Sequence, residues 1–174
     1  MNILNSENIY LRAIEPEDLD FLYKWENCVD VWEESNTLAP YSKFAIKRFI
    51  ERSLSESVFE IGQIRLMICL KDSKEVIGTA DIFDIDSINS RAAVGLLIDN
   101  NHRGKGYAKE ALDLLCYYAK STLLLNQLYV HISANNSACL NLFEKSDFEK
   151  CGTLKSWTKT SSGYKDAYIF QKIL

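Results

Sequence analysis

Hydrophobic positions along the chain change their spacing twice, and these changes predict the order of its elements. Residues 9–13 alternate between apolar and polar, as in a short strand. Two helical patterns follow, the first opening at Glu15-Pro16-Glu17-Asp18 and the second after Ser42, a residue that can cap it. The expected buried stripes are Leu19, Leu22, Tyr23 and Trp25 on the first helix, and Ala45, Ile46, Phe49, Ile50 and Leu54 on the second. Neither helix carries an obvious reactive group, so we expect a wall or lid.

From Gly62 onward the spacing changes to that of strands. Three segments rich in β-branched and apolar residues predict a meander: Gln63–Leu70, Glu75–Phe83 and Arg91–Ile98. We expect Asp84–Ser90 to form the second turn of this meander. Gly95 lies inside the third strand, which indicates a β-bulge or the close approach of a ligand.

The C-terminal half alternates strands with helices. An apolar stripe predicts a helix through Ala108, Ala111, Leu112, Leu115, Tyr118 and Ala119. Gln127–Ser133 predicts a strand, a second helix opens near Asn135, and two strands follow Cys151-Gly152. The fold class is therefore α/β (α+β), a single domain over residues 1–174 with a mixed, mostly antiparallel sheet of about six or seven strands and about four helices. An edge strand at Tyr168–Ile173 would allow a homodimer.

Composition restricts the class of protein. A chain of 174 residues fits one domain, and 47% hydrophobic with 25% charged residues is ordinary for a soluble globular protein. No apolar run approaches the roughly 20 residues that span a bilayer, and residues 1–7 lack the features of a signal peptide. The net charge of −4 argues against a nucleic-acid partner. We expect a cytoplasmic protein with no membrane partner.

Cysteine and histidine usage argues against a metal site. The five cysteines are far apart, and with two histidines no cysteine–histidine zinc pattern exists. Cys69 and Cys116 lie in apolar patterns and are expected to be small buried hydrophobic residues. Reduced thiols fit a cytoplasm.

The segment between the strand Arg91–Ile98 and the next helix has the character of an anion site. Gly104 and Gly106 are flanked by Arg103 and Lys105. Glycines let backbone N–H groups converge, and a helix N-terminus adds a positive dipole, so a phosphate group is expected here. The spacing fits neither a P-loop nor a dinucleotide motif. By itself, Gly-x-Gly also fits a tight turn with no ligand.

The larger pattern resembles a known family. The segment His102–Ala111 resembles the acetyl-CoA loop of the GNAT superfamily of N-acyltransferases, in the branch of the RimJ/RimL ribosomal-protein and SpeG-type polyamine acetyltransferases. A second match runs from Asn136 to Phe148 and resembles that branch's "Leu-Tyr-Glu-Lys-x-Gly-Phe" signature. The resemblance extends in element order over roughly residues 9 to 172, and two motifs at family spacing are more specific than one.

The resemblance implies acetyl-CoA as cosubstrate and no metal. The backbone amides that would hold the CoA pyrophosphate belong to Arg103, Gly104, Lys105, Gly106, Tyr107 and Ala108. The strand residues that would pair with the pantetheine arm are Leu96, Leu97 and Ile98, one of whose N–H groups would polarise the thioester carbonyl. Asn136 would bind the arm and Phe143 would pack near the thiol. On residue type, Asn136 fits a helix N-cap equally well.

Four positions depart from the family pattern. Asn101 replaces the usual glutamine or arginine, and Asp147 replaces the glycine of the second motif. Phe143 stands where a tyrosine often serves as general acid, and Ala93 stands where a glutamate is used as a base in some members. A catalytic pair cannot therefore be carried over.

Acetylation of an amine requires a neutral nucleophile. For a primary amine of pKa ≈ 10.4, neutrality at pH 7 costs roughly 4–5 kcal/mol, so a base must take the proton. Asp81, on the meander strand that borders the substrate in the family, is a candidate base; it could equally lie on a solvated strand face. Cys139, four residues before Phe143, is a candidate acid, although a buried small residue is the simpler interpretation.

The acceptor amine has weaker signals. Trp32, Glu33 and Glu34 in the first loop could attract a cationic amine, or the two glutamates could simply be solvated. His131 is expected to point to the opposite sheet face from Val130 and Ile132, with an open role.

Three functions compete. The favoured one is an acetyl-CoA-dependent N-acetyltransferase that acts on a primary amine, either a polyamine-like molecule or a protein N-terminus, by direct attack in a ternary complex. The second is a CoA-binding regulatory domain that has lost catalysis, motivated by Phe143 and Ala93. The third is an α/β domain that binds no CoA.

Overall fold

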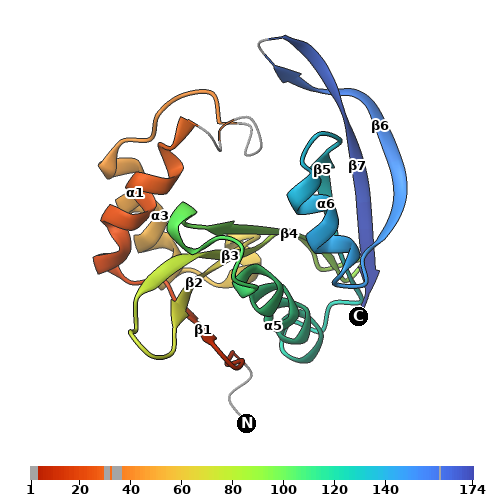
Figure 1. The fold of residues 1–174 in the computed structure, drawn as a ribbon. Coiled ribbons are helices and arrows are strands. Elements are labelled where there is room, and N and C mark those ends of the chain that lie inside the picture. Colours follow the sequence, from red (N-terminus) through yellow and green to blue (C-terminus); the bar gives the residue numbers. More distant parts are fainter. Residues whose placement is uncertain (1–3, 30–31, 33–36, 161) are drawn as a thin grey trace.

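The chain builds one seven-stranded sheet with helices on both faces (Figure 1). The computed structural model describes residues 4–29, 32, 37–160 and 162–174. The strands are β1 (Ile9–Ala13), β2 (Ile64–Leu70), β3 (Val76–Asp86), β4 (Arg91–Ile98), β5 (Gln127–Ser133), β6 (Glu149–Thr160) and β7 (Gly163–Ile173). They lie in the order β1-β2-β3-β4-β5-β7-β6, and only the β4–β5 pair is parallel. The predicted mixed, mostly antiparallel sheet is confirmed.

Five α-helices are present among the described residues. They are α1 (Leu19–Glu26), α3 (Lys43–Ser55), α4 (Val58–Ile61), α5 (Tyr107–Ser121) and α6 (Ser137–Glu144). The Ser42 hydroxyl accepts from the Ala45 N–H at 3.1 Å, so the predicted cap of α3 is confirmed. Sequence reasoning missed the short α4, which Ser57 caps with a capping box.

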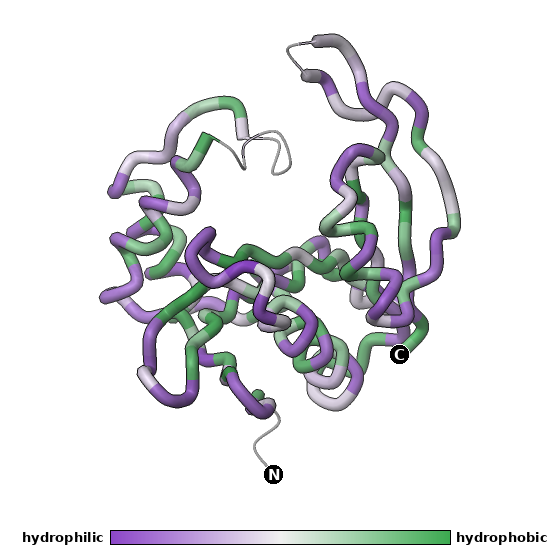
Figure 2. Tube along the Cα trace, in the orientation of Figure 1, coloured by the Kyte–Doolittle hydropathy of each residue, from purple (hydrophilic) through white to green (hydrophobic). Residues whose placement is uncertain are grey.

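The sheet is buried on both faces where the helices cover it. Leu66 and Ile68 of β2 contribute to the larger core, which includes α5 and Phe143 of α6, whereas Met67 and Cys69 contribute to the smaller core beneath α1 and α3. Successive strand side chains point to opposite faces, so β2 supplies both cores. Figure 2 shows hydrophobic positions gathered along the central strands and a hydrophilic β2–β3 turn. The predictions that Cys69 and Cys116 are buried are confirmed.

The predicted apolar stripes of the first two helices are wider than the buried ones. On α1, Leu22 and Trp25 are buried, but Tyr23 is 38% exposed. On α3, Ile46 and Ile50 are buried while Ala45 and Leu54 are exposed. Each of these helices covers only part of one sheet face, so a narrow apolar stripe is enough to pack it against the sheet.

One prediction about the meander is wrong, and one of the two interpretations of Gly95 is excluded. Asp84–Ser90 is not all turn, because β3 continues to Asp86 across a register shift at which Asp84 adopts φ +50°. Gly95 forms no bulge, because its neighbours pair with β3 in unbroken register from Gly78↔Ile98 to Phe83↔Ala93. The irregularity lies in β3 instead.

The predicted edge strand at Tyr168–Ile173 is also wrong. β7 pairs with β5 on one side and with β6 on the other, so its backbone is already used. β7, the last strand of the chain, lies between β5 and β6, so β6 and β1 form the edges of the sheet. Dimerisation through β7 therefore has no free edge.

Candidate active site

β4 and β5 separate after a short pairing, and this separation opens the centre of the sheet. β4 pairs with β5 only from Arg91 to Ala93, whereas β5 stays paired with β7 through Ser133. Figure 1 shows the two strands running apart, β5 toward α6 and β4 toward α1. The backbone of Leu96–Ile98 consequently has β3 on one side and no strand on the other. An extended group can add to such an edge through main-chain hydrogen bonds.

A loop at the end of β4 presents unused backbone donors. Gly104 (φ +76°) and Gly106 (φ +87°) both adopt left-handed conformations, and Gly106 is the N-cap of α5. The N–H groups of residues 104–108 donate no hydrogen bond to another described residue, whereas the Arg103 N–H reaches the Asn100 carbonyl at 3.4 Å. A β-carbon added to either glycine would meet nothing within 4 Å. Five consecutive free donors over open space at a helix N-terminus suit a phosphate or diphosphate.

Cations surround this loop. Lys105 is exposed and forms no ion pair with another described residue, whereas Lys109 pairs with Asp113 at 2.7 Å. The Arg103 Nε donates to the Ile98 carbonyl at 3.1 Å, which fastens the loop to the end of β4. Free backbone donors with an adjacent cation fit the pyrophosphate of CoA.

Asp99 fixes the first helix against the start of this loop. Its carboxylate accepts from Lys24 Nζ at 2.7 Å, from Trp25 Nε1 at 2.9 Å and from the Asn101 N–H at 3.1 Å. These donors, Lys24 first, hold the pKa of Asp99 well below its ordinary value despite burial. Sequence reasoning missed this contact, because nothing near Lys24 marks a partner 75 residues away.

The same contact borders a hollow of about 370 Å³ between α1 and the end of β4. Its lining residues are Lys24, Trp25, Cys28, Leu97, Ile98, Asp99, Asn100, Asn101 and Arg103. The helix predicted to be a wall therefore does form one side of the candidate site.

The helix α6 follows β5 and lies beside it, beyond the separation of the two strands (Figure 1). Asn136 Oδ1 caps it by accepting from the Cys139 N–H at 3.1 Å, while the side-chain nitrogen Nδ2 of Asn136 donates to no described residue. The capping role is thus confirmed, and a donor remains for a ligand. Phe143 is 3% exposed and packs edge-on against Phe148 with ring centroids 5.0 Å apart. Asp147 adopts φ +61°, so it takes the left-handed conformation expected of the family's glycine.

Comparison with known proteins decides what this arrangement belongs to. Residues 8–149 match the family described as "Acetyltransferase (GNAT) domain". The chain belongs to the GNAT acetyltransferase family. Members of this family take their acetyl group from acetyl-CoA, so the protein is an acyl-CoA-dependent acetyltransferase. The free amides of residues 104–108 lie where the resemblance had placed the CoA pyrophosphate.

Relatives of this GNAT protein include other N-acetyltransferases. It is 31% identical to "Uncharacterized N-acetyltransferase p20" of Bacillus licheniformis over 98% of this chain and 95% of that one. It is 26% identical to "Spermidine N(1)-acetyltransferase" of Vibrio cholerae, over 97% and 95% of the two chains. A crystal structure of spermidine N-acetyltransferase from Vibrio cholerae in complex with CoA and spermine superposes with TM-score 0.86 at 22% identity, covering 95% of each chain. A dodecameric structure of spermidine N-acetyltransferase from Vibrio cholerae has TM-score 0.78, also at 22% identity, over 95% and 93% of the two chains.

Asp81, the predicted base of this acetyltransferase, lies in an ion-pair network. Its Oδ1 accepts from Arg65 Nε at 2.6 Å, and Arg65 NH1 reaches Glu26 Oε1 at 2.5 Å. The Arg65 guanidinium also lies over the Phe49 ring, 5.2 Å from its centroid. Asp81 is 9% exposed, so the alternative of a solvated strand face is wrong. Burial raises the pKa of Asp81, and the Arg65 charge opposes that rise.

The predicted acid and acceptor residues are placed less completely. Cys139 is half-buried one turn before Phe143 and packs against the larger core. The Trp32 indole N–H donates to the Glu26 carbonyl at 3.0 Å, which attaches that ring to the end of α1. Glu33 and Glu34 lie outside the described residues.

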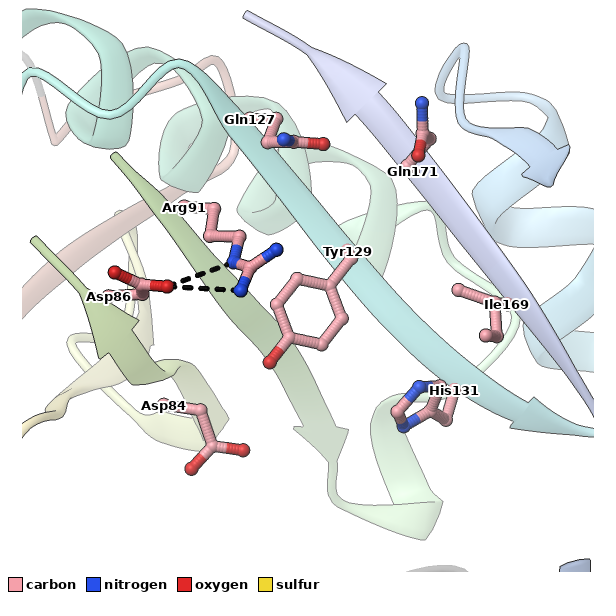
Figure 3. A pocket seen from close by; sticks show the side chains of 8 residues that line it. All are labelled: Asp84, Asp86, Arg91, Gln127, Tyr129, His131, Ile169 and Gln171. Carbon is pink, nitrogen blue, oxygen red and sulfur yellow. Dashed lines mark hydrogen bonds and ion pairs between the residues drawn. The ribbon is translucent and has the colours of Figure 1, made fainter. Parts of the chain in front are cut away.

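A second hollow, of about 560 Å³, lies on the sheet face where β4 and β5 are still paired. It is lined by Asp84, Asp86, Arg91, Gln127, Tyr129, His131, Ile169 and Gln171 (Figure 3). Val130 and Ile132 pack into the core on the opposite face, so the predicted orientation of His131 is confirmed. The Asp86 carboxylate pairs with Arg91 at 3.1 Å.

The described residues contain no group of three or more histidine, cysteine, aspartate or glutamate side chains arranged to hold a metal ion. No helix in the described part of the chain has the length and hydropathy needed to cross a membrane.

Proposed function

We propose that this GNAT enzyme acetylates a primary amine of a small, polyamine-like molecule by direct attack on acetyl-CoA in a ternary complex. We further propose that residues 1–174 act as one domain in this reaction. The observation that carries the proposal is the run of free N–H groups at residues 104–108 beside the unpaired edge of β4. The free N–H groups can bind a diphosphate, and the adjacent strand edge can pair with an extended chain. One CoA molecule contains both parts, a pyrophosphate followed by the pantetheine arm.

The choice of a small amine rests on the relatives. The Vibrio cholerae enzyme named for spermidine matches nearly the full length of this chain. A cationic acceptor would meet the Asp84 carboxylate in the hollow beside β5. Trp32, Glu33 and Glu34 stay predicted acceptor residues on the strength of the sequence alone. A peptide N-terminal amine is the alternative acceptor of the same chemistry, and the same assay tests it.

The neighbours also support an oligomer. A Vibrio cholerae spermidine N-acetyltransferase structure is dodecameric, and we propose that this chain assembles into a homo-oligomer. Sedimentation of the purified protein at micromolar concentration should give a mass several times that of one chain, and a monomer throughout would contradict this.

Proton transfer has two predicted participants. Asp81 is the predicted acceptor, directly or through water, and it would have to share its carboxylate with Arg65. Cys139 is the predicted donor to the leaving thiolate. Full activity of Asp81→Asn across the pH range would remove the first, and an unchanged pH–rate profile of Cys139→Ala would remove the second.

A CoA-binding regulatory domain remains the second candidate function, and the packing of Phe143 favours it. This ring fills the core against Phe148 and carries no hydroxyl. Loss of a general acid typically costs about 10²–10⁴-fold in rate. Because a thiol of pKa near 8.5 leaves easily, the low end of that range is expected and turnover should survive.

The deciding experiment measures thiol release from acetyl-CoA with a panel of amines and peptides. Spermidine, spermine, a diamine and short peptides with free N-termini would be compared with buffer. Turnover of a polyamine above all peptides supports the proposal. Binding of CoA with no turnover of any amine favours the regulatory domain, and no thermal shift with acetyl-CoA contradicts both.

A further inference from the structure

The opening between β4 and β5 has a histidine on one of its two sides. The last residues paired across the two strands are Ala93 and Tyr129. Two residues further along, Gly95 and His131 come next on the same face of each strand, because side chains alternate with period two. They are the first positions of that face beyond the paired segment on β4 and β5.

Both positions belong to the sheet face that carries α1 and α3. Arg91, which shares the face of Ala93 and Gly95, lines one hollow together with Tyr129 and His131. Figure 3 shows Tyr129 and His131 projecting from β5 on the side where Arg91 projects from β4. An acyl group entering between the strands would therefore meet Gly95, which has no side chain, on one side and an imidazole on the other.

The His131 side chain is available for proton transfer. It is exposed, and neither of its ring nitrogens forms a hydrogen bond or ion pair with a described residue. Its contacts are ring contacts, with Tyr129 at 5.8 Å and Trp157 at 6.2 Å between centroids. The other histidine, His102, has a buried Nδ1 and an Nε2 that faces Glu75 at 3.6 Å. Imidazole is the side chain that changes charge near neutral pH, which suits a base for an amine.

The charges that face His131 favour an approaching ammonium group. β3 contributes Asp84 and Asp86, β4 contributes Arg91, and β7 contributes only Ile169 and Gln171. Arg91 is paired with Asp86, whereas Asp84 forms no ion pair or hydrogen bond with another described residue. Burial raises the pKa of Tyr129, so β5 adds no charge here at neutral pH. The Asp84 carboxylate is therefore left without a paired cation among the described residues.

We propose that His131, and not Asp81, whose carboxylate is paired with Arg65, is the catalytic base that takes the proton from the acceptor amine, an assignment that rests on the proposed function. The ammonium transfers one proton to a ring nitrogen of His131. The neutral amine nitrogen then forms a bond to the thioester carbonyl carbon, the carbon–sulfur bond breaks, and the departing thiolate receives the second proton lost by the nitrogen. The imidazolium returns its proton to water, so the products are the amide, free CoA and one proton.

The test compares His131→Gln with Thr122→Ala, a control at an exposed position after α5 that lines neither hollow. With acetyl-CoA and spermidine, the wild-type kcat/KM should rise with pH as the base loses its proton and then level off. His131→Gln should lose about 10²-fold at pH 7, and the loss should shrink toward pH 9 as free amine becomes abundant. Thr122→Ala should keep the wild-type profile.

Three results would overturn the assignment. The first is an equal fractional loss for His131→Gln at every pH, which would indicate a binding or packing role. The second is a loss below about threefold, far smaller than general-base removal produces. The third is a pH dependence of kcat/KM that disappears in Asp81→Asn but is unchanged in His131→Gln. A thermal shift with acetyl-CoA in each variant shows that it is folded and binds the donor.

Failure of the proposed function has a different signature. If the wild-type protein binds acetyl-CoA but acetylates no amine, the function fails and the base assignment fails with it. If the wild type turns over spermidine and His131→Gln retains its rate and profile, only the base assignment fails.

Discussion

At the scale of single residues, the loop before α5 depends on backbone conformations that glycine adopts at small cost. Gly104 and Gly106 have φ values of +76° and +87° and are surrounded by open space. An L-residue in this region costs roughly 1–2 kcal/mol. Its β-carbon would also occupy the space in which a phosphate would meet the free amides.

Gly106→Ala should therefore weaken CoA binding more than it weakens the fold. We expect a loss of roughly 1–2 kcal/mol in the free energy of unfolding and at least a tenfold rise in the Kd for CoA, measured by calorimetry. Gly62→Ala is the matched control, because Gly62 has φ +74° and open space but lies far along the chain from the loop. An equal effect of both variants on the Kd for CoA would contradict the assignment of the residue 104–108 loop as the phosphate-binding site.

Asp99 makes stability dependent on pH. Its pKa is lowered in the folded protein, chiefly by Lys24 and Trp25. The stabilisation is therefore present above the unfolded-state pKa of about 3.9 and is lost as the pH falls below it. Asp99→Asn should lower the free energy of unfolding by about 1–3 kcal/mol at pH 7 and by less at pH 3.

Urea unfolding at the two pH values measures this difference. Asp72→Asn, in the exposed β2–β3 turn, should change stability by less than about 0.5 kcal/mol. A deficit of Asp99→Asn that is the same at pH 3 and pH 7 would show that the carboxylate charge is not the cause.

Some residue-level features could be predicted and others could not. The glycine loop and the Asn136 cap are local, so neighbouring residues reveal them. The Arg65 contacts with Asp81 and Glu26 join three separate elements, and only the folded chain brings them together. The predicted base consequently turned out to carry a salt bridge that no local pattern indicates.

At the scale of elements, α6 combines a cap with a candidate ligand donor. Asn136 uses its side-chain oxygen for the cap, which leaves its side-chain nitrogen for the pantetheine arm. Asn136→Asp keeps the capping oxygen and removes the donor.

We expect Asn136→Asp to change the free energy of unfolding by less than about 0.5 kcal/mol while raising the KM for acetyl-CoA several-fold. Asn136→Ala should cost about 1 kcal/mol in addition. Ser42→Ala, which removes the cap of α3, is the control that costs stability alone. An unchanged KM in Asn136→Asp would leave Asn136 as a cap only.

β3 and β4 approach so closely that one glycine is required between them. A β-carbon on Gly78 would lie 2.0 Å from the Leu97 carbonyl oxygen, whereas one on Gly95 would lie 3.3 Å from the Phe83 ring. The first neighbour is backbone and cannot move alone, but the second is the end of a side chain.

Gly78→Ala should therefore lower the free energy of unfolding by about 3 kcal/mol or more, and Gly95→Ala by about 1 kcal/mol. Denaturant unfolding of both variants measures the difference. Equal costs would show that the strand spacing adjusts freely.

Element order was the most predictable level of this structure. The change from helical to strand spacing located β2, β4 and β5 to within a residue. Sequence order does not determine strand order, however, and the return of β7 between β5 and β6 made the predicted edge wrong. The β-bulge expected at Gly95 in β4 is absent, and the break in regular pairing lies near Asp84 in β3 instead. Asp84 can adopt its positive φ because aspartate tolerates this conformation better than most residues.

At the scale of the whole molecule, the candidate site combines segments that lie far apart in the sequence. α1 and the loop at the end of β4 line one hollow, and β4 separates from β5 beyond Ala93 (Figure 1). The donor half of this site rests on backbone geometry that a short motif encodes. The proposed acceptor half would combine side chains from β3 and β5, and a motif does not encode such a combination.

Acetyl-CoA-dependent thiol release with spermidine tests the central claim most directly. The assay would follow free CoA at pH 7.5 with the wild-type chain and with Gly106→Ala at the same acetyl-CoA concentration. We predict spermidine-dependent release by the wild type, with monoacetylated spermidine as the product by mass spectrometry and a much slower rate for Gly106→Ala. Binding of acetyl-CoA without release of thiol for spermidine or any other amine would contradict the account.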